Sequence, residues 1–316
     1  MRRRGSRRLL LPVIVGLAIV TGITFGISYY AMRKMTFVGE RELYGKKLSI
    51  LAQEIRSELL KRSDISEVTF KTHDNLTLAG LLIKRQHPQA NLIVCHGYKS
   101  NKELSYGLID LYPSWNILLF DFRAHGQSEG LITTIGYHEA NDVVAASNFL
   151  RDYTQKTYNK KMPLIILGLS MGGAALLRAA ELEPGLCDAL VVDSSYAKLG
   201  TTVFKAFSMK SSLPRYPFLL IAQEMFQYLA NCDIHAMNPK DSVKTITKPI
   251  LFIHSCDDNY ISPKNAITLF SNSVNKQSKL WIGPHCRHAW LHSYYSELYK
   301  KKTTKFLQQV IPNLVA

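Results

Sequence analysis

The chain has 316 residues, of which 47% are hydrophobic, enough to bury the core of one large α/β domain or two small ones. With a mean hydropathy near zero, this composition excludes an intrinsically disordered chain and fits a globular protein with a membrane segment. The formal net charge is +15, but no basic stripe interleaved with aromatic residues accompanies it. We therefore expect no nucleic-acid partner, and attraction to an anionic membrane surface explains the charge more simply.

The chain begins with a basic tail, residues 1–8, which is followed by an uncharged stretch from Leu9 to Met32. As a helix, these 24 residues would span about 36 Å, more than the roughly 30 Å of a hydrocarbon core. A cleavable signal peptide shares the basic start, but its apolar run is shorter and a small-x-small cleavage site should follow it. The sequence thus predicts a transmembrane helix over residues 9–32.

The lysines and arginines near the two ends of this helix do not decide its orientation, because five lie on each side. A short tail with five arginines is hard to translocate, whereas a long domain crosses largely regardless of its charge. We therefore expect a single-pass membrane protein with a cytoplasmic N-terminus and its main domain on the opposite side. Ala18, Gly22 and Gly26 recur every fourth residue, so the helix has a seam for dimerisation, which nothing else in the sequence supports.

Residues 33–65 are expected to form an amphipathic stalk helix. From Glu40 to Arg62 the apolar residues recur every three or four positions, which is the period of such a helix. Its polar face is basic and suits contact with lipid headgroups, but packing against the main domain is the simpler interpretation.

Residues 66–316 show the alternation of strands and helices that is typical of one α/β domain. A hairpin with Asp and Asn in its turn comes first, and the later strands predict a parallel sheet with helices on both faces. The expected strands are residues 68–71, 76–83, 91–95, 117–120, 164–167, 189–192, 250–253 and 279–282. The expected helices are residues 137–150, 174–181, 263–270 and 292–310.

Residues 198–248 interrupt this alternation. The segment is far longer than the usual connection of about 2–6 residues and contains several aromatic residues, as well as Pro214 and Pro217. We expect a small helical cap over the ends of the strands, whose apolar side chains either line a pocket for an acyl chain or pack onto the domain.

The stretch from Gly168 to Gly173 has the sequence Gly-Leu-Ser-Met-Gly-Gly and lies between an expected strand and an expected helix. In such a strand-turn-helix unit, Gly-x-Ser-x-Gly lifts the serine hydroxyl clear of the sheet edge. Side chains at the two glycines would collide with the neighbouring strand and helix. The pattern predicts a nucleophilic serine at Ser170; the alternative is an ordinary helix start that Ser170 caps.

Polar residues also follow the other expected strands, where the carboxyl ends of parallel strands meet at one edge of the sheet. A serine, an acid and a histidine thereby come to one edge in the chain order Ser, Asp, His, the order of one particular hydrolase architecture. The residues concerned are His96-Gly97-Tyr98, Asp121 to Ser128, Ser170, Asp257 and Asp258, and His285 to His288.

From about residue 66 to residue 312, the chain resembles the α/β-hydrolase superfamily, most closely its single-domain esterase, lipase and serine-peptidase branch with a small lid. The resemblance implies a mostly parallel, eight-stranded α/β-hydrolase sheet with helices on both faces and a small helical cap. It implies neither a metal ion nor an organic cofactor. The motifs that carry it are His96-Gly97-Tyr98, the run from Asp121 to Gly130, the elbow from Gly168 to Gly172, and the run from Lys248 to Asp258.

The resemblance also implies a role for each motif, which general chemistry supports. The nucleophile attacks an acyl carbonyl, the base takes its proton, and the acid holds the imidazole while backbone N–H groups stabilise the oxyanion. The implied catalytic residues are Ser170, Asp258 and His288. The implied oxyanion donors are the backbone N–H groups of Tyr98 and Met171. The implied supporting residues are His96, Gly97, Gly168 and Gly172, with His125 bracing an adjacent loop.

Two of these assignments have alternatives. The family pattern His-Gly-x-x-Asp-x-x-Val selects Asp258 over Asp257 as the acid, although Ser255 stands where the family usually has glycine. For the base we favour His288 over His285, which follows a proline, and over His292, which falls on the last expected helix.

Five cysteines are scattered through the chain without Cys-x-x-Cys spacing, which argues against a zinc site. Cys256 and Cys286 each lie two residues before a proposed triad member, and the family places their loops side by side. A disulfide between them would suit an oxidising compartment, but two unpaired thiols are the simpler expectation.

Taken together, the sequence predicts a membrane-anchored serine hydrolase that cleaves carboxylic esters, including lipid-like esters, through an acyl-enzyme. A serine peptidase of the same fold is one alternative, and acidic groups in the cap that bind a substrate amine would favour it; the cap offers chiefly Glu224 and Asp233. The other alternative is a catalytically silent hydrolase fold used as a binding module.

Overall fold

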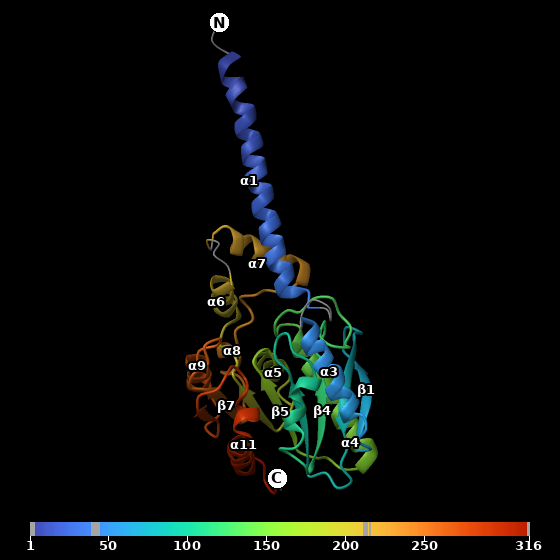
Figure 1. Cartoon of the computed structure of the whole chain (residues 1–316). Helices are drawn as coiled ribbons and strands as arrows, with labels where there is room; N and C mark the ends of the chain where they lie inside the picture. Colours follow the sequence, from blue (N-terminus) through green and yellow to red (C-terminus); the bar gives the residue numbers. More distant parts are fainter. Residues whose placement is uncertain (1–3, 39–44, 211–213, 215, 315–316) are drawn as a thin grey trace.

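The computed structural model describes residues 4–38, 45–210, 214 and 216–314. At the centre of the main domain lies an eight-stranded sheet with the order β1-β2-β4-β3-β5-β6-β7-β8, in which only β2 runs against the other strands (Figure 1). The predicted mostly parallel sheet of eight strands is therefore confirmed. The strands are β1 Ile65–Lys71, β2 Thr77–Ile83, β3 Ala90–Cys95, β4 Trp115–Phe120, β5 Leu164–Leu169, β6 Ala189–Asp193, β7 Ile250–Ser255 and β8 Lys279–Gly283.

Two apolar cores lie on opposite faces of the sheet, because successive side chains of a strand point to opposite sides. In β3, Leu92 and Val94 belong to one core, whereas Ile93 and Cys95 belong to the other. Strands buried on both faces are continuously apolar, which is why the sequence reveals them so clearly. The helices on the side of Ile93 include α4 (Glu139–Tyr158), α5 (Met171–Leu182) and α9 (Lys264–Asn272). Those on the side of Leu92 include α3 (Gly45–Leu59), η1 (Glu103–Leu108) and α11 (Ser296–Val310).

Two helices differ from their expected bounds. The expected helix 292–310 is broken into α10 (Leu291–Tyr294) and α11, because Tyr295 leaves the helical region with φ −131° and ψ 48°. The helix α4 continues past Leu150 to Tyr158, where only Thr154 is still buried, and ends at the left-handed Asn159. The apolar period that predicts a helix therefore stops before the helix itself does.

The N-terminal part of the chain forms a long helix, α1 (Arg4–Thr36), that projects from the domain (Figure 1). Its segment Pro12–Thr36 is long and apolar enough to cross a membrane. The helix α3 follows, and its residues Ile55 and Leu59 pack into the core on the sheet face of Leu92. Of the expected stalk helix, residues 33–65, the first four belong to α1, and residues 39–44 lie outside the described residues.

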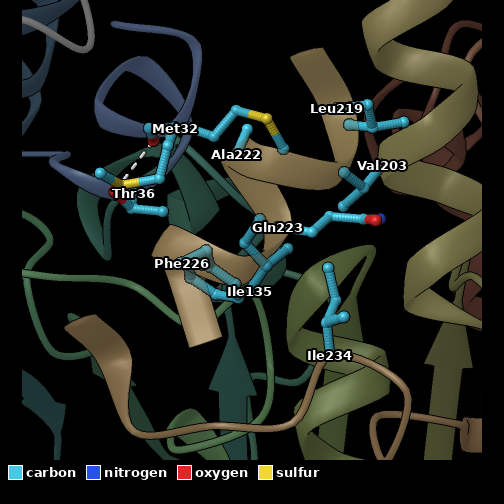
Figure 2. Close-up of a pocket in the computed structure, with 10 residues that line it drawn as sticks. Met32, Thr36, Ile135, Val203, Leu219, Ala222, Gln223, Phe226 and Ile234 are labelled. Atoms are coloured by element: carbon cyan, nitrogen blue, oxygen red, sulfur yellow. Dashed lines mark hydrogen bonds between the residues drawn. The ribbon is translucent and has the colours of Figure 1, made fainter. Parts of the chain in front are cut away.

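The described part of the segment between β6 and β7 forms the helices α6 (Leu199–Lys210), α7 (Phe218–Ala230) and α8 (Pro239–Ser242). The end of α1 packs against α7, and Met32 of α1 and Ala222 of α7 line the same small pocket, which Figure 2 shows. Ser28, Met32 and Thr36 are spaced four residues apart and are all buried, so one face of the last turns of α1 is covered. The helix α1 is thus in contact with the folded domain at its C-terminal end.

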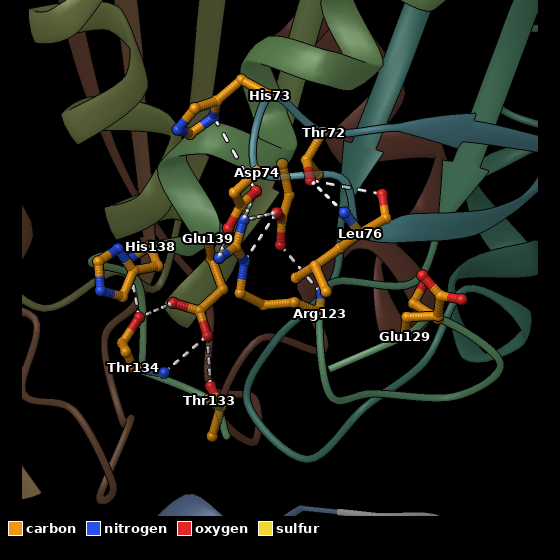
Figure 3. A network of polar contacts seen from close by, with 12 residues as sticks. Thr72, His73, Asp74, Leu76, Arg123, Glu129, Thr133, Thr134, His138 and Glu139 are labelled. Atoms are coloured by element: carbon orange, nitrogen blue, oxygen red, sulfur yellow. Dashed lines mark hydrogen bonds and ion pairs between the residues drawn. The ribbon is translucent and has the colours of Figure 1, made fainter. Parts of the chain in front are cut away.

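A buried ion-pair cluster around Arg123 joins three elements on the loop side of the sheet (Figure 3). The guanidinium of Arg123 donates to Asp142 of α4 at 2.6 and 2.9 Å and to Asp74 of the β1–β2 turn at 2.8 and 3.1 Å. Asp142 is completely buried and also accepts the backbone N–H of Arg123 at 2.9 Å. The cluster therefore fixes the loop after β4 against α4.

Replacing Arg123 by Met should destabilise the fold, since the buried carboxylate of Asp142 would lose its charged partner. Breaking such a pair costs about 3–5 kcal/mol. In a domain of this size that loss lowers the melting temperature by roughly 6 °C or more. Thermal unfolding followed by intrinsic fluorescence in detergent would measure it, with Lys160→Met, an exposed position just after α4, as the control. Equal melting temperatures of the two variants would contradict this role of Arg123.

Candidate active site

Ser170 lies on a sharp turn between the end of β5 and the start of α5. Its backbone has φ 53° and ψ −115°, a strained conformation for a residue with a side chain, and its N–H donates to the Asp193 carbonyl at 2.8 Å. The side chain of Ser170 makes no capping hydrogen bond to α5, so the alternative of an ordinary helix cap does not describe it. The turn instead presents the hydroxyl at the edge of the sheet.

The glycines around Ser170 are required by close backbone contacts. A Cβ at Gly172 would lie 2.2 Å from the Cys95 carbonyl oxygen at the end of β3, and one at Gly168 would lie 2.5 Å from the Gly172 carbonyl oxygen. Real Cβ atoms do not approach backbone so closely, so larger residues would force strand and helix apart. The two glycines thus set how closely α5 begins beside β3.

Gly172→Ala should therefore lower both the stability of the protein and the rate at which Ser170 reacts with a fluorophosphonate probe. Overpacking of this kind costs about 1–3 kcal/mol, and here the obstacle is backbone that has little freedom to yield. Melting temperature and the rate of probe labelling would report the two effects. Gly107→Ala is the matched control, because a Cβ there meets nothing within 4 Å. A Gly172→Ala variant that matches Gly107→Ala in both measurements would contradict the packing argument.

Two side chains from other loops meet Ser170 in a hydrogen-bonded chain. The Nε2 atom of His288 lies 2.7 Å from Ser170 Oγ, and its Nδ1 atom lies 2.6 Å from Asp258 Oδ2. Because a carboxylate only accepts, Nδ1 carries a proton, and in this tautomer Nε2 is the acceptor for the serine hydroxyl. The loops after β5, β7 and β8 supply the three residues, and the parallel register brings these strand ends to one edge.

Asp258 is held as a carboxylate by several donors. Its Oδ1 atom accepts the N–H groups of Tyr260 and Ile261 at 2.9 Å each, and its Oδ2 atom lies 3.2 Å from Nε2 of His254. Burial alone would raise the pKa of this carboxyl, but the hydrogen bonds from His254 and His288 outweigh burial and hold its pKa well below the ordinary value. The group facing His288 is therefore negatively charged at neutral pH.

The alternatives to Asp258 and His288 lie away from Ser170. Asp257 and His285 are exposed and face each other, with 3.6 Å between Asp257 Oδ2 and His285 Nδ1. His292 is buried on α10, and burial lowers its pKa to about 4. The structure therefore brings together Ser170, Asp258 and His288 and leaves the other candidates outside.

The loop that carries Tyr98 passes directly beside Ser170. A Cβ added at Gly97 would lie 3.4 Å from Ser170 Cβ, and Met171 stands at the first position of α5. The buried ring of His96 donates through Nδ1 to the Gly97 carbonyl at 2.8 Å and accepts the Phe122 N–H through Nε2 at 3.0 Å. Burial lowers the pKa of His96 to about 3, so this ring is neutral and braces the loop.

Two other features predicted from the sequence are the loop that begins at Asp121 and the cysteine pair Cys256 and Cys286. Asp121 is buried and accepts hydrogen bonds from Lys102 Nζ at 2.6 Å and from the Gln127 N–H at 2.9 Å. The thiols of Cys256 and Cys286 are not joined to each other in this structure. Within the described ranges, no three His, Cys, Asp or Glu side chains gather into a group that could hold a metal ion.

Comparison with known proteins agrees with this architecture. A family model described as the alpha/beta hydrolase fold matches residues 90–210. Among solved structures, the Pyrococcus furiosus esterase Pf2001 is similar with a TM-score of 0.64 and 24% identity over 78% of this chain and 91% of its own. The protein has the α/β-hydrolase fold. Est1E from Butyrivibrio proteoclasticus, solved with ferulic acid bound, is similar with a TM-score of 0.62 and 17% identity over 77% of this chain and 99% of its own.

Two sequence relatives each match more than two thirds of the chain. The uncharacterized protein YqkD of Bacillus subtilis is 29% identical over 223 residues, which are 69% of this chain and 71% of that protein. An uncharacterized membrane protein of Saccharomyces cerevisiae is 20% identical over 224 residues, 69% of this chain and 71% of its own. These comparisons show the fold of the chain.

A further carboxyl group, that of Asp193, lies near the site and is not among the site residues predicted from the sequence. Asp193 ends β6, is completely buried, and accepts the Ser194 hydroxyl at 2.8 Å. Burial raises its pKa to about 6. An acid directly after the apolar run 189–192 was the available signal.

Asp193 should make the stability of the hydrolase fall as the pH rises. Its folded pKa lies above the unfolded value, so the native state binds more protons and loses stability between about pH 4 and pH 6. Asp193→Asn should not show this loss. From pH 4.5 to pH 7 the melting temperature of wild type should therefore fall by about 4 °C or more relative to that of the variant. A constant difference between the two proteins at both pH values would contradict the raised pKa. Asp257→Asn, at an exposed carboxyl, is the control.

Proposed function

We propose that this protein is a membrane-anchored serine hydrolase that cleaves carboxylic esters through an acyl-enzyme intermediate. The observation that carries the proposal is the chain of two short hydrogen bonds from Asp258 through His288 to Ser170. A nucleophile, a base and an orienting acid at these distances are the parts that acyl transfer requires. The strained turn at Ser170 adds support, because strain of this kind is typical of functional sites.

In the proposed acylation step, Ser170 Oγ bonds to the acyl carbon while His288 Nε2 takes the hydroxyl proton. The resulting imidazolium is stabilised by the charged Asp258 and then protonates the leaving alcohol as the ester C–O bond breaks. Water next attacks the acyl-enzyme with His288 again as the base, which releases the acid and restores Ser170. The ester and water are the only reactants, and the two steps together account for every bond and proton.

The oxyanion that forms in each step is assigned to the backbone N–H groups of Tyr98 and Met171. Both residues adjoin Ser170: Met171 follows it in the chain, and Tyr98 follows Gly97, which packs against it. The N–H of Met171 also lies at the start of α5, where the helix dipole favours negative charge. Losing one such donor typically costs about a hundredfold or more in rate.

The preference for esters over peptides is supported by the cavity beside the site. None of the described residues that line it is an aspartate or glutamate able to bind a substrate amine. The acidic residues of the cap, Glu224, Asp233 and Asp241, are not part of this lining. A silent binding module has no need of an aligned serine, histidine and aspartate.

We assign the membrane anchor to α1, whose segment Pro12–Thr36 is long and apolar enough to cross a bilayer. Most large apolar side chains of this segment, such as Val20 and Ile23, are exposed, which is unfavourable in water and favourable in lipid. The basic tail is placed on the cytoplasmic side and the hydrolase domain on the opposite side.

The proposal is tested by a fluorophosphonate probe and a short-chain chromogenic ester. Ser170→Ala should abolish labelling and lower ester hydrolysis to the background rate, about 10⁴-fold or more below wild type. Asp258→Asn should lower the rate about 10⁴-fold, because the imidazole then loses its correct tautomer. The neighbouring exposed carboxyl offers a control, and Asp257→Asn should stay within twofold of wild type. Equal labelling of wild type and Ser170→Ala would refute the serine hydrolase assignment.

A further inference from the structure

A cavity of about 450 Å³ lies between the end of α1, the cap helix α6 and two loops of the candidate active site. Its volume is within the usual range of roughly 300–1,000 Å³ for small-molecule sites. Most of its lining is apolar. Residues that represent its walls are Ile27, Ala31 and Met35 of α1, Phe207 of α6, and Tyr98 and Tyr260 of the loops.

Two residues that line the cavity, Tyr98 and Tyr260, are neighbours of the candidate triad. The ring of Tyr260 lies 5.1 Å from the ring of His288, measured between centroids. Tyr98 directly follows Gly97, the residue that packs against Ser170. An ester carbonyl at Ser170 therefore lies near a mostly apolar cavity, one wall of which is α1.

The wall formed by α1 is ordered by specific contacts with the domain. The Tyr98 hydroxyl donates to the Met35 carbonyl at 2.8 Å, and the Thr133 N–H donates to the Thr36 carbonyl at 2.9 Å. Met32 and Thr36 are buried beside them against the cap. Five residues of α1 line the cavity, spaced three or four positions apart on one face of the helix: Ile27, Tyr30, Ala31, Lys34 and Met35.

The same helix fixes the depth of the cavity relative to a bilayer. Counted from Pro12, a hydrocarbon core of about 30 Å ends near Ala31, since each residue rises about 1.5 Å. The side chains of Tyr29 and Tyr30 are exposed at this level, and Arg33 follows them, the order of aromatic and basic residues at a membrane surface. The cavity residues Ile27 and Ala31 therefore lie at the boundary between acyl chains and headgroups.

From this placement we infer that the membrane helix α1 is itself one wall of an acyl-chain site, and that the substrate is a lipid ester resident in the membrane. Its acyl chain enters at the bilayer surface along Ile27 and Ala31 and lies in the cavity, while the ester carbonyl reaches Ser170. The inference rests on the proposed function, because it assumes that Ser170 attacks the ester.

The test uses the full chain in phosphatidylcholine nanodiscs and two fluorophosphonate probes, one with a butyl and one with a hexadecyl chain. Ala31→Trp places an indole in the cavity at the α1 wall and should lower the ratio of hexadecyl to butyl labelling rates at least tenfold. Ile23→Trp lies on the same helix but is exposed and outside the cavity, so its ratio should stay within twofold of wild type. An unchanged ratio in Ala31→Trp would overturn the acyl site, whereas a wild-type protein that neither probe labels would overturn the proposed hydrolase function.

A second measurement needs no variant and covers the case in which Ala31→Trp fails to fold. A hexadecyl probe with a diazirine near the end of its chain is bound to Ser170 of the wild-type protein, irradiated, and the crosslinked peptide identified by mass spectrometry. Crosslinks to residues 27–35 support the inference. Crosslinks confined to other parts of the chain overturn it, and absence of the Ser170 adduct itself counts against the proposed function alone.

Discussion

The candidate site depends on how closely two backbones approach, at Gly172 in α5 and at the Cys95 carbonyl that ends β3. Only a residue without a side chain permits this contact, and the contact brings the turn at Ser170 beside the loop of His96 and Tyr98. The Ser170 N–H donates to the Asp193 carbonyl and ties the same turn to β6. One serine is thereby fixed against the strands on both sides of its own.

Two buried carboxyl groups near this turn show how their surroundings set their charge. Asp258 accepts backbone N–H groups and imidazole nitrogens, so it stays ionised despite burial. For Asp193 burial prevails over the Ser194 hydroxyl, and its pKa rises to about 6. Their difference in hydrogen bonding explains why Asp258, and not Asp193, suits the proposed role of stabilising an imidazolium.

Much of the fold was predictable from sequence because buried strands are apolar on both faces and because glycines mark the turn at Ser170. The predicted parallel sheet is confirmed. The family pattern selects Asp258 over Asp257, but the physical difference between them lies in the loop conformation, which turns the Asp258 carboxyl toward His288 and leaves that of Asp257 exposed. The contact of α1 with the domain could not be predicted from the sequence either. A helix that is apolar all round has no stripe that predicts a partner, and the covered face of α1 even contains Ser28 and Thr36.

The hydrogen bond from Tyr98 to the Met35 carbonyl has a practical consequence for handling this protein. Removing α1 to obtain a more soluble protein would also remove the carbonyl that accepts this hydrogen bond from Tyr98, on the loop beside Ser170. It would uncover the apolar cap surface around Ala222 and Phe226 that Met32 now covers (Figure 2). Newly exposed surfaces of this kind promote aggregation. Biochemical work should therefore retain the chain through Thr36, in detergent or lipid.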